Sequence, residues 1–114
     1  MKTSFEPEVF GDVLERIHEY SVRAWLYLPK VDPWRMSASC AVIESEDAPE
    51  SIADTLDPAL AREHDLQRAL PVSVVQDIVL NAHEQIDVAS RRDLFSAFVY
   101  YYDHDAFIDF EQRG

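Results

Sequence analysis

Residues 90–110 read SRRDLFSAFVYYYDHDAFIDF and contain the densest aromatic run of the chain. Ser90 and Asp93 have the spacing of a capping box, in which the serine oxygen accepts a backbone N–H and the carboxylate accepts another in return. The apolar residues that follow recur at helical spacing and predict a helix with one wide buried stripe, made of Leu94, Phe95, Phe98, Val99 and Tyr102. Asp103-His104-Asp105 ends this pattern, and the alternation from Ala106 to Phe110 predicts a short strand.

The length and composition of the chain set the limits of the fold. With 114 residues, 47% of them hydrophobic, the chain can form one core without disulfides. Its 22 acidic residues outnumber the 10 basic ones and give a formal charge of −12 at pH 7. Such a charge repels phosphate backbones and anionic membranes and favours basic partners. Many bacterial proteins are acidic for solubility alone, so the charge does not by itself identify a partner.

The remaining segments predict an α+β fold in a single domain covering residues 1–114. Apolar spacing predicts a helix that starts near Pro7 and reaches Tyr20, followed by strands at 24–28 and 39–43 that pair as a hairpin. Residues 69–72 predict a short edge strand or an extended lead-in, and Ser73 with Gln76 predicts a capping box for a helix over 74–85. We therefore expect a small, mostly antiparallel sheet covered by about three longer helices.

The cysteine content and the N-terminus indicate a cytoplasmic protein. Cys40 is the only cysteine of the sequence, so no disulfide can form within the chain. The first eight residues carry no apolar signal-peptide core, and no apolar run approaches the length of a membrane span. Cys40 lies in a small apolar strand without a basic neighbour, which predicts a buried and unreactive thiol.

The segment between residues 44 and 65 is the most acidic part of the chain. Pro49 and Pro58 each have the position of a first-turn helix residue, so the segment is expected to form two short helices or one broken segment. Its acids form either a solvated charged face or a surface on which a basic partner lands. The acids expected to supply the charge to a partner are Glu44, Glu46, Asp47, Glu50 and Asp54.

The sequence lacks the motifs of common catalytic and cofactor sites. Its two glycines exclude a glycine-rich phosphate loop, and neither HExxH nor CxxC is present to bind zinc. Asp103, His104 and Asp105 could bind a cation weakly. The alternative is a solvated helix end, which is favoured because adjacent helical residues point in different directions. We expect no enzyme activity, no cofactor and no metal. A deep pocket lined by His64 or His104 with carboxylates would indicate an enzyme instead.

Recognition by charge and aromatic side chains is the function that these exclusions leave. Trp34 in its loop and Tyr100, off the buried stripe, are expected to be exposed aromatics. Beside the acids Asp103 and Asp105 they would suit a cationic target. Packing of Trp34 onto the core is the alternative, since tryptophan is highly buried on average. A basic patch for nucleic acid is missing, because Arg91-Arg92 is the only basic doublet.

Several packing motifs resemble a family of small acidic bacterial domains. They are Trp25-Leu26-Tyr27-Leu28-Pro29, Cys40-Ala41-Val42, Val75-Gln76-Asp77-Ile78-Val79 with Asn81-Ala82, and Phe98-x-Tyr100-Tyr101-Tyr102 with Asp105-Ala106-Phe107-Ile108. Similar proteins are encoded in polymorphic-toxin neighbourhoods, where such domains act as immunity proteins. The resemblance implies a protein that binds and blocks a cognate basic toxin domain such as a nuclease, and it transfers no catalytic residue. A regulatory or scaffolding module and a nucleic-acid mimic remain alternatives.

Overall fold

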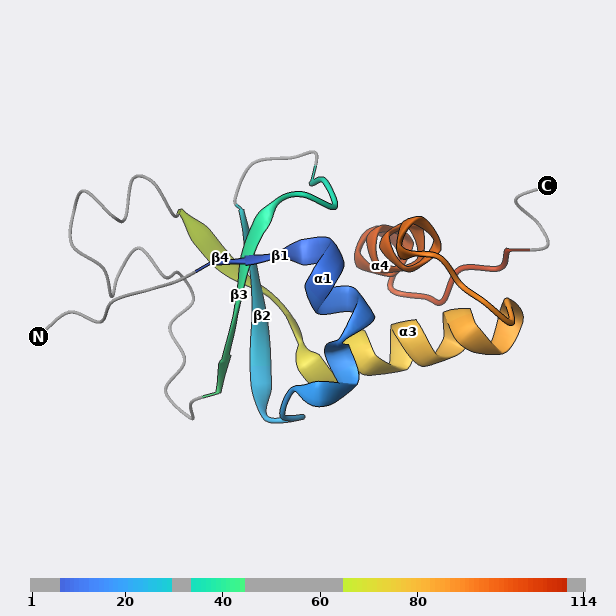
Figure 1. Cartoon of the computed structure of the whole chain (residues 1–114), viewed down its shortest axis with the longest axis horizontal. Helices are drawn as coiled ribbons and strands as arrows, with labels where there is room; N and C mark the ends of the chain where they lie inside the picture. The colour runs from blue at the N-terminus through green and yellow to red at the C-terminus, as the bar shows by residue number, and fades with distance from the viewer. Residues whose placement is uncertain (1–6, 30–33, 45–64, 111–114) are drawn as a thin grey trace, which may run out of the picture.

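Helices pack on one side of a four-stranded antiparallel sheet in the computed structural model, which describes residues 7–29, 34–44 and 65–110 (Figure 1). The strands are β1 (Glu8–Val9), β2 (Ala24–Pro29), β3 (Ser39–Glu44) and β4 (Leu66–Pro71), in the sheet order β1-β3-β2-β4. The helices are α1 (Phe10–Glu15), the 3-10 helix η1 (Ile17–Glu19), α3 (Val72–Gln85) and α4 (Arg91–His104). The α+β class predicted from the sequence is confirmed.

The predicted hairpin of β2 and β3 forms, and the structure places it at the centre of the sheet. Leu26 lies opposite Val42 and Tyr27 opposite Ala41. Leu26 belongs to the core under the helices, whereas Tyr27 is fully buried without belonging to that core. On the face of Tyr27, Trp25 and Pro29 are half-buried. Both faces of β2 are therefore covered at least in part, which explains why its sequence is a continuous apolar run and does not alternate.

The strand β4 lies at the edge of the sheet, as predicted, but it is longer than the sequence indicated. It pairs with β2 from Leu66 to Pro71, with an irregularity between Leu26 and Tyr27. The sequence did not indicate the first half of β4, because Gln67 and Arg68 are polar and hydropathy does not report backbone pairing. At its other end Val72, which we expected in the strand, is the first residue of α3.

The predicted N-terminal helix is interrupted at both ends. Glu8 and Val9 pair with β3, and the helix starts only at Phe10, so Pro7 is not in its first turn. The amide of Phe10 donates to the carbonyl oxygen of Ala38 at 2.9 Å, and the amide of Gly11 donates to that of Met36 at 2.8 Å. The chain therefore makes tertiary hydrogen bonds where the apolar spacing predicted the start of the helix. The end of the predicted helix is formed by the 3-10 helix η1.

The capping box predicted for α3 is wrong, whereas the one predicted for α4 is confirmed. Ser73 lies inside α3, whose N-cap is Pro71 without a side-chain hydrogen bond. Gln76 donates instead to the carbonyl oxygens of Ile17 and Tyr20, both at 3.1 Å, and so ties α3 to η1. In α4 the amide of Asp93 donates to Ser90 Oγ at 3.1 Å, and the amide of Ser90 donates to Asp93 Oδ2 at 2.9 Å.

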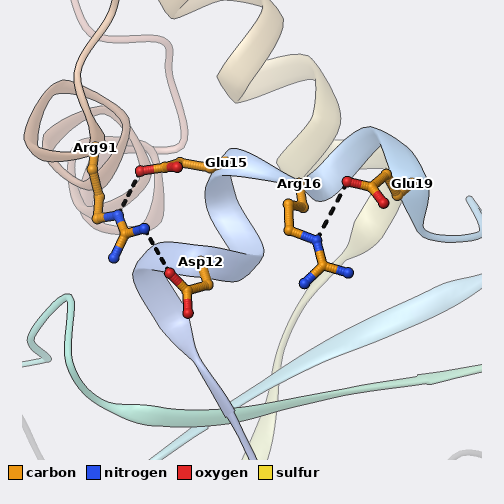
Figure 2. Close-up of polar contacts among 5 residues, drawn as sticks. All are labelled: Asp12, Glu15, Arg16, Glu19 and Arg91. Carbon is orange, nitrogen blue, oxygen red and sulfur yellow. Dashed lines mark hydrogen bonds and ion pairs between the residues drawn. The ribbon is translucent and has the colours of Figure 1, made fainter.

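The helix α4 forms an outer layer that packs on α1 and α3 (Figure 1). The rings of Phe10 and Phe98 meet edge to face, with centroids 4.9 Å apart. At the surface, Arg91 Nη2 lies 2.6 Å from Asp12 Oδ1 and Arg91 Nε lies 2.5 Å from Glu15 Oε1 (Figure 2). Aromatic packing and an ion-pair bridge thus hold the last helix on the first one.

The strand predicted after α4 does not form. Residues 106–109 follow the helix as an irregular segment in which Ile108 is buried and Phe107 is 47% exposed. Gln85 Nε2 donates to the carbonyl oxygen of Ile108 at 2.7 Å, and the amide of Phe110 donates to Gln85 Oε1 at 3.1 Å. The alternation in the sequence therefore reports the inward side chains of Ile108 and, in part, Phe110. The backbone hydrogen bonds are made by a glutamine side chain and not by a neighbouring strand.

Candidate functional site

A surface pocket of about 280 Å³ lies along α4, on the side where the chain returns after the helix. All lining residues but one belong to α4, and the remaining one is Ile108 of the returning segment. The lining residues are Phe95, Ser96, Val99, Tyr100, Asp103, His104 and Ile108. The pocket is thus built by one helix and by the buried side chain that packs beside it.

The helical period explains why these side chains share one surface. The residues of α4 form two rows with a spacing of four, namely Phe95–Val99–Asp103 and Ser96–Tyr100–His104. Side chains four residues apart are neighbours on a helix, so each row runs along the helix axis. Each row ends in an ionisable group, and both of these groups lie at the C-terminal end of α4.

An aromatic pair forms one wall of the pocket. The rings of Tyr100 and His104 lie with centroids 4.3 Å apart and planes tilted by 33°. Tyr100, which we expected to be exposed, is half-buried and packs against the core, whereas His104 and Asp103 are exposed. The pocket is therefore apolar at its base and polar at its rim.

The end of α4 is fixed by Asp105, which adopts the left-handed conformation with φ 55° and ψ 37°. Its amide donates to the carbonyl oxygen of Tyr101 at 2.7 Å and closes the last turn. Aspartate tolerates this conformation better than most residues. The expected helix end at Asp103-His104-Asp105 is confirmed, and Asp105 lies next to the pocket without lining it.

Trp34 packs on the core, which is the alternative that the sequence left open. Its ring contacts Tyr102 and Phe98, with centroids 4.6 and 5.9 Å away, and its indole N–H donates to the carbonyl oxygen of Pro29 at 2.8 Å. Tyr102, predicted in the buried stripe, is 42% exposed. Trp34 does not line the pocket.

The structure brings together two of the predicted site residues, Tyr100 and Asp103. Glu44 is exposed at the end of β3, opposite Ala24 of β2. The other predicted acids, Glu46, Asp47, Glu50 and Asp54, lie outside the described residues, as does His64. The prediction missed Phe95, Ser96, Val99, His104 and Ile108 as pocket residues. The two rows of α4 could have been found by their spacing, but nothing in the sequence places Ile108 beside them.

The described residues offer little for metal or thiol chemistry. Among them no group of three His, Cys, Asp or Glu side chains could hold a metal ion. Cys40 is buried, and burial raises the pKa of its thiol to about 12, as expected for an unreactive cysteine. His104 and the carboxylate of Asp103 do line this pocket, but both are exposed at its rim, whereas the enzyme alternative requires a deep pocket. The arrangement suits binding of a group with an apolar body and a positive end.

These features define a small α+β domain with an aromatic-walled pocket on its last helix. The chain belongs to the family described as Domain of unknown function (DUF7716), whose model matches residues 8–110. No match was found among curated proteins or among solved structures. The matched range includes all of α4 and Ile108, so the pocket lies inside the domain that defines the family.

A search for membrane-spanning helices gave a negative result for the described residues. Within them, none of the helices combines the length and the apolar character that crossing a membrane requires.

Proposed function

We propose that this chain is an immunity-type protein that binds a cognate basic toxin domain and neutralises it by occlusion. The observation that carries the proposal is the joint position of Tyr100 and Asp103 in one surface pocket of a chain with a formal charge of −12. A carboxylate beside the face of an aromatic ring is a recognition site for cationic side chains. The resemblance of the packing motifs to immunity proteins supports the same function.

The proposed mechanism is steric and electrostatic. The negative field speeds the encounter with a positively charged partner, and contacts at the pocket and the neighbouring acids then hold the complex. Asp103 and Asp105 act at the end of α4, and the acidic segment contributes Glu44, Glu46, Asp47, Glu50 and Asp54. The protein performs no reaction of its own and works in the cytoplasm, where it meets the toxin.

Capture followed by a rescue assay tests this proposal. The tagged protein is incubated with a lysate of its source organism, and captured proteins are identified by mass spectrometry. Each captured protein is then expressed in a heterologous host, alone and together with this chain. We expect one captured protein to be basic and to stop growth when expressed alone, and we expect growth to recover on co-expression.

The same assay separates this function from the alternatives. A captured protein that is harmless when expressed alone contradicts the immunity function and favours a regulatory or scaffolding module. A nucleic-acid mimic would instead bind several unrelated DNA- or RNA-binding proteins and would lose all of them to competing nucleic acid.

A further inference from the structure

We infer that the pocket on α4 receives an arginine side chain of the basic partner. The inference rests on the proposed function, because it names the group by which that partner is held. It follows from three properties of the pocket: its apolar base, its aromatic wall and the carboxylate at its rim.

The apolar base fits the carbon stem of a long cationic side chain. Phe95, Val99 and Ile108 line the pocket, and Ile108 is only 3% exposed. Arginine and lysine bury their methylene stems on apolar surface while the charged head stays near water. A carboxylate ligand or a short polar side chain would leave this base unused.

The aromatic wall favours arginine over lysine. Tyr100 lines the pocket, and its ring lies against that of His104. A guanidinium group is planar, stacks on aromatic faces and is more weakly hydrated than an ammonium group. Arginine therefore loses less hydration than lysine when it enters a pocket with an apolar base.

The carboxylate at the rim supplies the charge. Asp103 is exposed beside Tyr100, and within the described residues no ion pair occupies it. At the other end of the same helix, by contrast, the charge of Arg91 is already paired with two carboxylates of α1. Asp103 is therefore available to a guanidinium group, which can bind a carboxylate through two parallel hydrogen bonds.

An NMR titration of the whole chain tests the inference. The probe is a capped Gly-Arg-Gly peptide, and the matched control peptide replaces arginine by citrulline, which keeps the shape and loses the charge. We expect the arginine peptide to shift the backbone amide signals of Phe95–His104 and Ile108. We expect the citrulline peptide to bind about fivefold more weakly or worse, because the exposed ion pair is lost.

Two substitutions with the same chemical change locate the binding group. Asp103→Asn should weaken binding of the arginine peptide by about three- to fivefold, as expected for an exposed charge pair. Asp77→Asn removes the same charge from an exposed position of α3 that does not line the pocket, and it should leave the affinity unchanged. Amide spectra of both variants without peptide show whether the fold is intact.

The outcomes separate the pocket from the proposed function. Equal binding of the citrulline peptide, shifts confined to other elements, or equal effects of Asp103→Asn and Asp77→Asn overturn the pocket assignment. A captured toxin that binds Asp103→Asn as tightly as the wild type also overturns it while leaving the immunity function in place. Arginine binding at the pocket without any toxin to neutralise supports the pocket and contradicts the proposed function.

Discussion

At Gly11 the first and last helices leave no room for a side chain beside Arg91. A Cβ atom at this position would lie 2.6 Å from Arg91 Cδ, which is too close for the present arrangement of Arg91. The Arg91 side chain, which lies against Gly11, forms ion pairs with Asp12 and Glu15. Figure 2 shows these two ion pairs. The absence of a side chain at Gly11 therefore makes room for the ion-pair bridge, although glycine itself weakens a helix.

A double-mutant cycle tests this arrangement. In an Arg91→Ala background, Gly11→Ala should stabilise the protein by about 0.5–1 kcal/mol, because alanine loses less backbone entropy in a helix than glycine. In the wild-type background the gain should be smaller or reversed, because the new methyl group displaces Arg91 from its carboxylates. Urea unfolding of the four proteins measures the difference. An equal effect in both backgrounds would show that the glycine and the arginine are not coupled.

The pH dependence of the same cycle provides a control. The hydrogen bond from Arg91 is the main cause that holds the pKa of Glu15 below its ordinary value of 4.5. A lowered pKa means that the contact contributes stability above pH 4.5 and loses it as the pH falls through the lower, folded-state pKa. The coupling between positions 11 and 91 should therefore shrink in acid.

Cys40 gives a prediction with the opposite dependence on pH. Burial, with lesser effects of Glu8 and Asp12, raises the pKa of its thiol from 9.0 to about 12. The neutral thiol therefore contributes stability that is complete below pH 9.0 and is lost as the pH rises toward about 12, since the unfolded thiol ionises first. Cys40→Ala should remove this part of the alkaline loss of stability, measured by urea unfolding at a series of pH values.

Thiol labelling provides the independent check on Cys40. The native protein should not react with a disulfide reagent at pH 8, whereas the protein unfolded in urea should react with one equivalent. Rapid labelling of the native protein would contradict the buried position of this cysteine.

At the scale of elements, two serines have the sequence pattern of a capping box, but only one of them forms it. Ser90 and Asp93 form both hydrogen bonds of the box, whereas Ser73 forms no cap because α3 starts at Val72. The backbone of β4 continues directly into α3, with Pro71 in an extended conformation at the junction. The strand thus fixes where α3 starts, and the side-chain signal is overridden.

The two serines provide a matched pair of substitutions. Ser90→Ala should destabilise the protein by about 1 kcal/mol, because the amide of Asp93 loses its acceptor. Ser73→Ala should change the free energy of unfolding by less than about 0.5 kcal/mol, and in the stabilising direction, because alanine is the better helix former. Thermal or urea unfolding measures both values. Similar losses for the two variants would contradict the assigned start of α3.

At the scale of the whole molecule, the formal charge of −12 governs association more than folding. With the toxin captured as described above, the association rate constant should fall steeply as salt is added, because the Debye length shortens from about 30 Å at 0.01 M to about 8 Å at 0.15 M. Stopped-flow or surface-based kinetics measures the rate. A rate that does not change with salt would contradict the electrostatic part of the mechanism.

Charge reversal at two places distinguishes a local surface from the general field. Reversing Glu44 and Glu46 to lysine changes the net charge by as much as reversing Asp77 and Glu84 on α3. If the acidic segment guides the partner, the first pair should slow association more than the second. Equal slowing would show that the net charge alone matters.

The sequence by itself determined the elements whose signals are local. The hairpin of β2 and β3 and the capped helix α4 follow from apolar runs and from the spacing of Ser90 and Asp93. Two members of the candidate site, Tyr100 and Asp103, were found because charge and aromatic character are visible in the residues themselves. Their presence in one pocket depends on the helical period, which the sequence also carries.

Only the tertiary structure decided the features that depend on partners distant in the chain. Pairing with β3 turned Glu8 and Val9 into a strand, and Gln85 held Ile108 beside α4 where the alternation predicted a strand. Trp34 packs against Phe98 and Tyr102, so it is not the exposed aromatic that its loop position suggested. A backbone amide or an aromatic ring binds whichever complementary group the folded chain brings within reach, and local spacing does not encode which group that is.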